Sequence, residues 1–451
     1  MAWTRVSSTR WERPISGMEV YTSLIGKSSA AVYPGREQYV MFSRLKVDLN
    51  IADPVSALKQ AWTQARCTDP DLATTLEDDK KIYEVPTQAG LQKWLESTFI
   101  ISDEPNGDAI YESQPKITQA TLYYLPKALE LVFRAPHYTI DGIGVMMFWD
   151  RFLSAITTPK HITFGKEYRN LAPPLEQALE CPAMPTLEQT ETAHAMLMGY
   201  IDSLPSIGPV SRVGKAPAAR CRNIEHTFSP ETTSAIIAAS RRLQVSVTSV
   251  VHAAYIRTII KHADPHSLKS RYTSIAEFDL RRYMHKPSNK VAVANYYTAL
   301  YFSTDLPSCF RDLVRALDRF YKTSVRDYPE VREMTGEYMR LMGELVQGHE
   351  YQNAPIPTDA MVSSLGVVER YVRREYTDGK VVVKDFKLTL DVVLGMSVMH
   401  VFTFGERLRL VYAFNDGYEE PVKIRGYLED VERVLRGGLG FDMQMYFISC
   451  T

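Results

Sequence analysis

Residues 134–144 of the chain read Arg-Ala-Pro-His-Tyr-Thr-Ile-Asp-Gly-Ile-Gly. Residues 128–135 are nearly all apolar and predict a buried strand. Residues 144–156 have the apolar spacing of an amphipathic helix. The sequence therefore predicts a turn between a buried strand and a helix, with His137 at the end of the strand and facing a cleft.

The composition of this turn is typical of a catalytic site. The pKa of a histidine lies near working pH, as a general base requires. Asp141 follows on the same loop, and Gly142 permits a sharp turn or the close approach of a ligand. Of the ten histidines, His137 alone has an aspartate four residues later. With Asp at about 5 % and Gly at about 7 % of residues, ten histidines give about 0.03 chance matches to His-x-x-x-Asp-Gly.

Outward from this turn, the chain has the organisation of a two-lobed α/β protein. Its 451 residues exceed what one hydrophobic core usually supports. Residues 171–217 hold seven of the 25 prolines and predict a crossover between lobes. We expect an N-terminal lobe over residues 1–174, a linker over 175–217 and a C-terminal lobe over 218–451.

The order of strands and helices favours mixed sheets with helices on one side over a doubly wound parallel sheet. We expect strands over residues 38–48, 120–125, 128–135, 225–228, 271–281, 293–304, 360–365, 380–390, 397–403 and 408–414. We expect helices from Pro54, and over residues 144–156, 188–204, 232–243, 247–262, 309–347 (interrupted near Pro329) and 422–435, the last stopped by Gly437 and Gly438.

Charge and composition exclude several classes of protein. The formal net charge is -1 and the pI is about 6.8, so neither nucleic acid nor an anionic membrane is implied as a partner. No apolar run is long enough to span a bilayer, and the N-terminus lacks a secretory signal. The five cysteines have no paired spacing and predict reduced thiols in a cytoplasmic protein: Cys67, Cys181, Cys221, Cys309 and Cys450.

We expect neither a metal nor a bound cofactor. His262 and His266 have the spacing of a helical zinc pair, but Pro265 should end the helix between them and no third ligand is near. The glycines over residues 142–144 and 437–440 lack the surrounding fingerprint of a dinucleotide site.

The segment from His137 through Asp141 to Gly142 resembles the HxxxD(G) signature of one enzyme superfamily. That superfamily contains BAHD acyltransferases, fungal alcohol and trichothecene O-acetyltransferases, and the condensation domains of peptide synthetases. The resemblance covers nearly the whole chain and is nearest to the trichothecene 15-O-acetyltransferase type. It implies two similar chloramphenicol-acetyltransferase-like lobes with a channel between them and the histidine at its middle.

The resemblance also implies a mechanism and a set of site residues. Acyl-CoA, a co-substrate, enters from one face and a small alcohol acceptor from the other. His137 deprotonates the acceptor hydroxyl, which attacks the thioester without a covalent acyl-enzyme. Asp141 is structural and pairs with an arginine of the second lobe. In this sequence that arginine is Arg281, in the Asp-x-Arg segment of residues 277–281, with Arg282 as the alternative.

Later segments match fungal members in character, over residues 361–366, 388–392 and 410–416. Within the first of these, Ser363 or Ser364 is able to hydrogen-bond the oxyanion or the acceptor. The implied acceptor is a hydroxylated secondary metabolite, and the implied protein is a monomer.

Two departures from the superfamily pattern keep alternatives open. Condensation domains carry a second histidine before the catalytic one, where this chain has Pro136. The plant DFGWG motif is reduced to Asp385-Phe386. One alternative is a condensation or cyclisation enzyme that uses a carrier-protein thioester, and another is a non-catalytic binding protein on the same scaffold.

Overall fold

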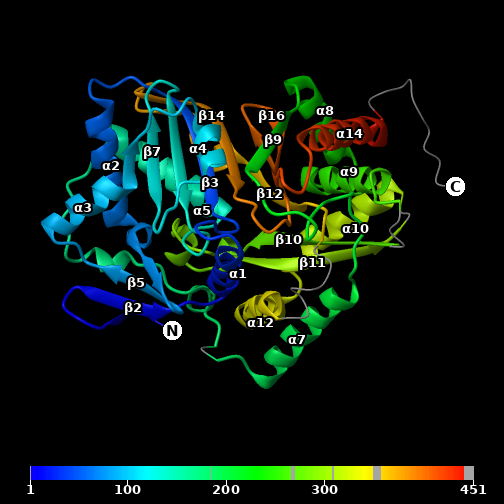
Figure 1. Ribbon diagram of the computed structural model, residues 1–451, viewed down its shortest axis with the longest axis horizontal. Coiled ribbons are helices and arrows are strands. Elements are labelled where there is room, and N and C mark those ends of the chain that lie inside the picture. The colour runs from blue at the N-terminus through cyan, green and yellow to red at the C-terminus, as the bar shows by residue number, and fades with distance from the viewer. Residues whose placement is uncertain (1, 183, 266–269, 307–308, 349–356, 441–451) are drawn as a thin grey trace.

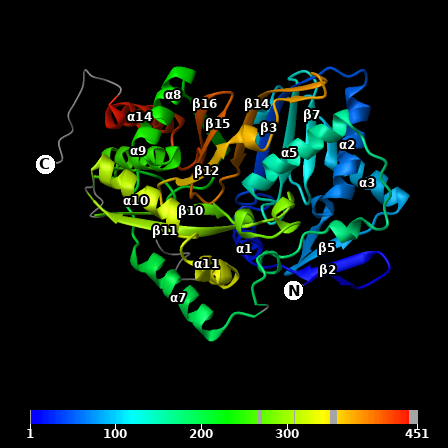
Figure 2. The ribbon, with the colours of Figure 1, turned by 180° about the vertical axis from the view of Figure 1, so that it is seen from behind.

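The computed structural model describes residues 2–182, 184–265, 270–306, 309–348 and 357–440, so His266 and Cys450 lie outside the described residues. The chain forms two lobes side by side, with a two-stranded sheet and helices packed below their junction (Figures 1 and 2). Both lobes are mixed α/β, which confirms the predicted fold class. The four described cysteines form no disulfide.

A six-stranded sheet forms the first lobe, in the order β13-β14-β3-β8-β7-β6. Its neighbours pair antiparallel except β6 and β7, which are parallel. The strands are β3 (Met41–Leu49), β6 (Phe99–Ile101), β7 (Thr121–Leu125), β8 (Glu130–Ala135), β13 (Glu375–Tyr376) and β14 (Val381–Leu390).

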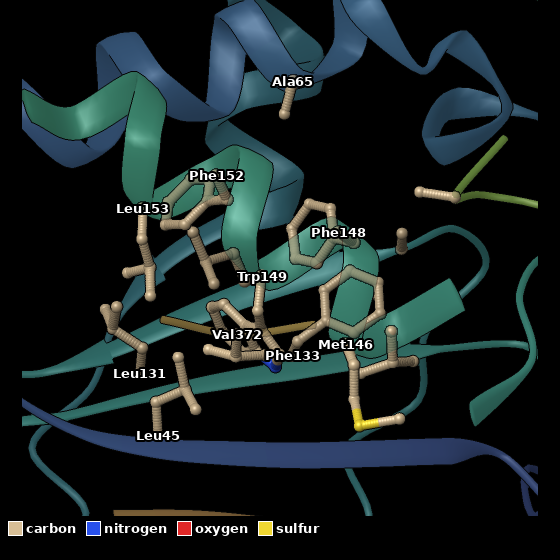
Figure 3. Close-up of a cluster of buried hydrophobic side chains, with 14 of the residues drawn as sticks. Leu45, Ala65, Leu131, Phe133, Met146, Phe148, Trp149, Phe152, Leu153 and Val372 are labelled. Atoms are coloured by element: carbon tan, nitrogen blue, oxygen red, sulfur yellow. The ribbon is translucent and has the colours of Figure 1, made fainter. Parts of the chain in front are cut away.

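Helices α2 (Pro54–Thr68), α3 (Gln88–Thr98) and α5 (Gly142–Thr157) lie together against this sheet (Figure 1). The sequence starts α2 as expected, because Asp53 caps it by accepting a hydrogen bond from Ser56 N and Pro54 fits the first turn. Figure 3 shows the core beneath α5, where Phe148 and Trp149 pack on Phe133 of β8. This packing fixes the strand and the helix that flank His137.

Two strands of the first lobe come from late in the sequence. β14 pairs along its length with β3, from Val381 opposite Leu49 to Leu390 opposite Met41, and β13 pairs with β14. The two halves of the chain are therefore joined by a continuous hydrogen-bonded sheet. The division at residues 174 and 217 stays a prediction, with these two strands reaching across it.

The second lobe is built on a four-stranded sheet in the order β12-β15-β16-β9, in which β12 and β15 are parallel. Its strands are β9 (Cys221–Thr227), β12 (Met361–Val367), β15 (Val398–Phe404) and β16 (Arg407–Asn415). Helices α8 (Pro230–Arg242), α9 (Val247–Lys261) and α14 (Pro421–Leu439) cover one face. On the other face Phe402, Phe404 and Val411 join the core of the first lobe.

Below the junction, β10 (Arg271–Asp279) pairs antiparallel with β11 (Tyr297–Asp305). This hairpin packs with the helices α1 (Met18–Val32), α7 (Leu187–Asp202) and α12 (Thr335–Gln347) around a third apolar cluster. Helices α4 (Gly107–Ser113), α6 (Leu175–Ala178), α10 (Phe310–Thr323) and α11 (Pro329–Glu333) complete the helical set of the described residues.

Several details differ from the sequence-based expectations. Helix α14 runs through Gly437 and Gly438 and ends at Gly440, whose φ of 76° supplies the left-handed conformation that a helix stop favours. The small sheet at the N-terminus, β1 (Thr4–Arg5), β2 (Arg10–Pro14), β4 (Thr75–Glu77) and β5 (Lys80–Glu84), was not expected. Neither was helix α1.

Within the described ranges, no single helix is long and apolar enough to cross a membrane. The pair α8 and α9 passes that test only when taken together, and it is bent by 105°.

Candidate active site

His137 lies on the turn between β8 and α5, at the junction of the lobes. Asn295, just before β11, donates a hydrogen bond from Nδ2 to the carbonyl of His137 at 2.6 Å. The hydroxyl of Tyr297 lies 3.4 Å from Nε2 of His137, and the two rings stack with centroids 5.8 Å apart. Groups from the second half of the chain therefore fix both the backbone and the ring of this histidine.

The environment of His137 keeps its imidazole neutral. Burial lowers the pKa of His137 below the ordinary 6.5, while the carbonyls of His137 and Ile140 and the carboxylate of Asp141 oppose the shift. Nδ1 is buried and has no hydrogen-bond partner among the described residues. A neutral imidazole can accept a proton at neutral pH, as a general base must.

Asp141 ties the turn to both lobes. Its carboxylate accepts a hydrogen bond from Gly144 N at 2.7 Å and so caps α5. It also accepts one from Tyr296 N at 2.8 Å, next to β11. Asp141 is only 4 % exposed, and the hydrogen bonds to its carboxylate come from the protein itself.

Arg281 is the partner of Asp141. Its Nη1 donates to both carboxylate oxygens, at 3.0 and 2.9 Å, and to Asp279 at 3.1 Å. Its Nε donates to Val291 O at 3.1 Å, and Arg281 is 4 % exposed. Arg282 is exposed and lies over the ring of Tyr283, so the structure places Arg281 and not Arg282 beside Asp141.

The two glycines of the turn meet different constraints. Gly142 is the first residue of α5, where a Cβ would lie 2.9 Å from a methyl group of Leu365. At Gly144 a Cβ would lie 2.2 Å from the carbonyl oxygen of Ala292 and 3.2 Å from Nη2 of Arg281. The close approach expected at Gly142 therefore involves side chains, and the closer backbone approach is at Gly144.

A cavity opens beside His137, and its empty space of about 490 Å³ includes open solvent at its mouth. Its wall takes side chains from both halves of the chain and is mostly apolar. The lining residues are Met18, Tyr21, Thr22, Tyr39, His137, Ile275, Glu277, Tyr297, Ala299, Met339, Met342, Met361, Leu390 and Val398.

The two candidate serines lie on opposite faces of β12. Ser364 shares a hydrogen bond of 2.8 Å with the hydroxyl of Thr248 in α9, away from the cavity. Ser363 pairs in register with His400 of β15, next to the pair Met361 and Val398, which lines the cavity. Because side chains alternate along a strand, Ser363 shares the face that meets the first lobe.

Two ionisable residues near His137 have no role assigned from the sequence. Glu277 lines the cavity, and burial raises its pKa to about 7, against opposing hydrogen bonds with its own backbone and with the side chain of Ser363. Burial, and then the nearby His137, lower the pKa of His400 to about 3, so that His400 is neutral. Two sequence signals could have identified these residues as candidates. Glu277 lies within a predicted strand, and His400 lies within the apolar residues 398–404.

Ion pairs brace the strands around the site. Arg134, three residues before His137, donates to Asp391 at 2.6 Å, and both side chains are buried. Asp385, in the place of the missing plant motif, accepts from Arg44 of β3 and from Arg409 of β16. Of these pairs, Asp385–Arg409 connects strands of the two lobes.

A neutral histidine on a braced turn between two mixed-sheet lobes faces a mostly apolar cavity, as the resemblance to acyltransferases leads us to expect. Comparisons with known proteins agree. The O-acetyltransferase pigM of Monascus ruber is 25% identical over 87% of this chain and 78% of its own. The acetyltransferase pigO of the same organism is 25% identical over 98% of both chains. These relatives confirm the prediction of an acyltransferase.

A solved structure is similar along the whole chain. The TRI3 trichothecene 15-O-acetyltransferase of Fusarium sporotrichioides superposes with a TM-score of 0.82 at 15% identity, covering 98% of each chain. This likeness confirms the expected two-lobed fold and the resemblance to fungal O-acetyltransferases. No family model matches the chain.

Proposed function

We propose that this chain transfers an acyl group, most simply acetyl, from acyl-CoA to a hydroxyl of a small secondary metabolite. His137 is the general base. The observation that carries the proposal is the neutral imidazole at the cavity wall, held by Asn295 and Tyr297 of the second half of the chain. The names of the fungal relatives supply the reaction class.

The reaction proceeds by direct transfer. Nε2 of His137 takes the proton of the acceptor hydroxyl as its oxygen attacks the thioester carbonyl. A C–O bond forms and the carbonyl becomes an oxyanion. The C–S bond then breaks, and the leaving thiolate takes the proton back from His137. The products are an ester and free CoA, and no acyl-enzyme forms. Binding both substrates in one cavity supplies proximity.

The remaining site residues position the His137 turn and stabilise the charge of the oxyanion. Asp141, Gly142 and Arg281 hold the turn in place. The developing oxyanion needs hydrogen-bond donors. Ser363 interacts with Glu277 and lies on the face of β12 that carries the cavity-lining Met361. It therefore suits that role, or contact with the acceptor, better than Ser364, which bonds Thr248 in α9 away from the cavity.

The proposal also covers the lobe boundaries, the location, the oligomeric state and the partners of the protein. The lobes span residues 1–174 and 218–451, joined by 175–217, and the later span contributes β13 and β14 to the sheet of the first lobe. The protein acts as a cytoplasmic monomer, with acyl-CoA as co-substrate and no resident cofactor. Its near-neutral charge favours a small-molecule acceptor over a nucleic acid or membrane partner.

The experiment that tests the donor compares two acetyl thioesters over a panel of hydroxylated metabolites. Thiol release is followed with acetyl-CoA and with acetyl carrier protein. The proposal predicts release from acetyl-CoA that an acceptor accelerates. Release only from the carrier protein would replace it with the condensation-type alternative. Absence of release from both donors, with no binding of CoA by calorimetry, would favour the non-catalytic alternative.

A further inference from the structure

The wall of the cavity beside His137 is mostly apolar and contains one acidic side chain. Methionines on three elements, namely Met18, Met339, Met342 and Met361, form much of the surface. Methionine side chains adapt to irregular ligand shapes. Glu277 is the one acidic side chain, and no Lys or Arg is present, among the described residues that line the cavity.

Strand pairing directs Glu277 into the cavity. It lies opposite Ala299 in the β10–β11 ladder, and Ala299 lines the same cavity. Ile275, two residues earlier on β10, also lines it. Because alternate residues of a strand share a face, Ile275, Glu277 and Ala299 form one continuous patch of wall.

The carboxyl of Glu277 is not saturated by the protein. Its Oε2 is buried and has no hydrogen-bond partner among the described residues. The contrast with Asp141 is direct, because Asp141 accepts from Gly144 N, Tyr296 N and Arg281. An unpaired buried carboxylate oxygen at a cavity wall is a candidate for ligand contact.

We infer that Glu277 selects the acceptor. It accepts a hydrogen bond from a second donor group, a hydroxyl or an ammonium, held by an otherwise apolar molecule whose reacting hydroxyl lies at His137. This inference rests on the proposed function and narrows it to one class of acceptor: bifunctional, with an apolar body against the methionines. A donor group on the ligand satisfies Oε2, which nothing described in the cavity wall does.

The groups around the carboxyl of Glu277 determine which kinds of donor group on the acceptor it can bind. His137 and His400 are both neutral, and Ser363 and Tyr297 are uncharged hydroxyls. Burial raises the pKa of Glu277 to about 7, so carboxylate and acid are both populated near neutrality. An ammonium on the acceptor stabilises the carboxylate, and a hydroxyl donates to it without a charge.

The experiment uses three matched series of acceptors of increasing chain length: 1-alkanols, α,ω-diols and ω-amino-1-alkanols. The ratio of kcat/KM for each bifunctional acceptor to its matching alkanol is measured with acetyl-CoA. A hydrogen bond to a charged group contributes roughly a 10- to 100-fold ratio at the best chain length. Glu277→Gln keeps a carbonyl acceptor and so should lose the preference for ammonium but retain part of that for hydroxyl. Glu277→Leu should lose both.

Glu330→Gln is the matched control, because it changes an exposed glutamate of α11 that is not among the residues lining the cavity, and its ratios should equal those of the wild type. Melting curves verify that each variant is folded. A ratio near one in the wild type, or ratios unchanged in Glu277→Leu, would overturn the inference while leaving the proposed function in place.

If the wild type acetylates no alcohol, calorimetry without acyl-CoA tests the role of Glu277 separately from the proposed acyltransferase function. That result contradicts the proposed function. Glu277 is then tested by binding alone, in which the amino alcohols should bind the wild type more tightly than the alkanols and Glu277→Leu should bind both equally. Equal binding to the wild type would overturn the role of Glu277.

Discussion

Replacing Asp141 by asparagine removes the charge that joins the His137 turn to the second lobe. In the wild type, the carboxylate of Asp141 accepts one hydrogen bond each from Gly144 N and Tyr296 N, and two from Arg281 Nη1. Asparagine keeps one acceptor oxygen and places an NH₂ group among these donors. Arg281, 4 % exposed, would keep a buried charge balanced only by Asp279, which is 30% exposed at its side chain.

Breaking a buried ion pair by removing one partner costs about 3–5 kcal/mol. Folded proteins have only about 5–15 kcal/mol of stability, so the loss is a large share of the total. At roughly 2 °C per kcal/mol for a large chain, the melting temperature falls by about 6–10 °C. Soluble yield falls with it, while the folded fraction keeps part of its turnover because His137 is intact.

Melting curves of Asp141→Asn, Arg281→Met and the double variant test this reasoning. The double variant should lose less stability than the sum of the two single variants, because each single variant leaves a buried charge without its partner. The matched control is Asp103→Asn, whose exposed carboxylate pairs with the exposed Lys127 and should matter little. A soluble Asp141→Asn with wild-type stability and no turnover would refute the structural role and make Asp141 catalytic.

Three further predictions concern the same turn. Burial lowers the pKa of His137 below 6.5, and only the neutral ring accepts a proton. We therefore expect kcat/KM for a simple alcohol to be constant near neutral pH and to fall as the pH drops through that lowered pKa. A fall in kcat/KM centred above pH 6.5 would contradict this prediction. Gly144→Ala should lower the melting temperature far more than Gly142→Ala, because its Cβ meets a backbone oxygen at 2.2 Å rather than a movable methyl group; equal melting temperatures would count against this packing. Tyr297→Phe keeps the ring stacking and removes the hydroxyl 3.4 Å from Nε2, so kcat/KM should fall roughly 2- to 10-fold; a loss as large as that of removing His137 would show a catalytic hydroxyl.

Local signals in the sequence predicted many elements of the fold, although not α1 or the small N-terminal sheet. The apolar run before His137 and the amphipathic pattern after it became β8 and α5, and the Asp53-Pro54 pair starts α2. The pairing of β14 with β3 was not predicted, because strand partners more than 300 residues apart leave no periodic trace. Two glycines within α14 were taken for its end, although helix packing tolerates glycine and only Gly440 has positive φ.

The residues of the site also divide into those that the sequence predicted and those that it did not. His137, Asp141 and Arg281 were found because their spacing matches a known signature, and the structure places them within one turn and its brace. Glu277, Tyr297 and His400 follow no spacing rule, because they come to the cavity through the register of two sheets. Only the tertiary structure could bring them together with His137.

The central claim is that His137 is the base for transfer from acetyl-CoA. The most direct test is the rate of thiol release from acetyl-CoA for the wild type, His137→Ala and the control His161→Ala, which changes an exposed histidine. The account predicts that kcat falls by roughly 10²–10⁴ in His137→Ala, as expected for loss of a general base, and is unchanged in His161→Ala. Equal turnover by a folded His137→Ala and the wild type would contradict it.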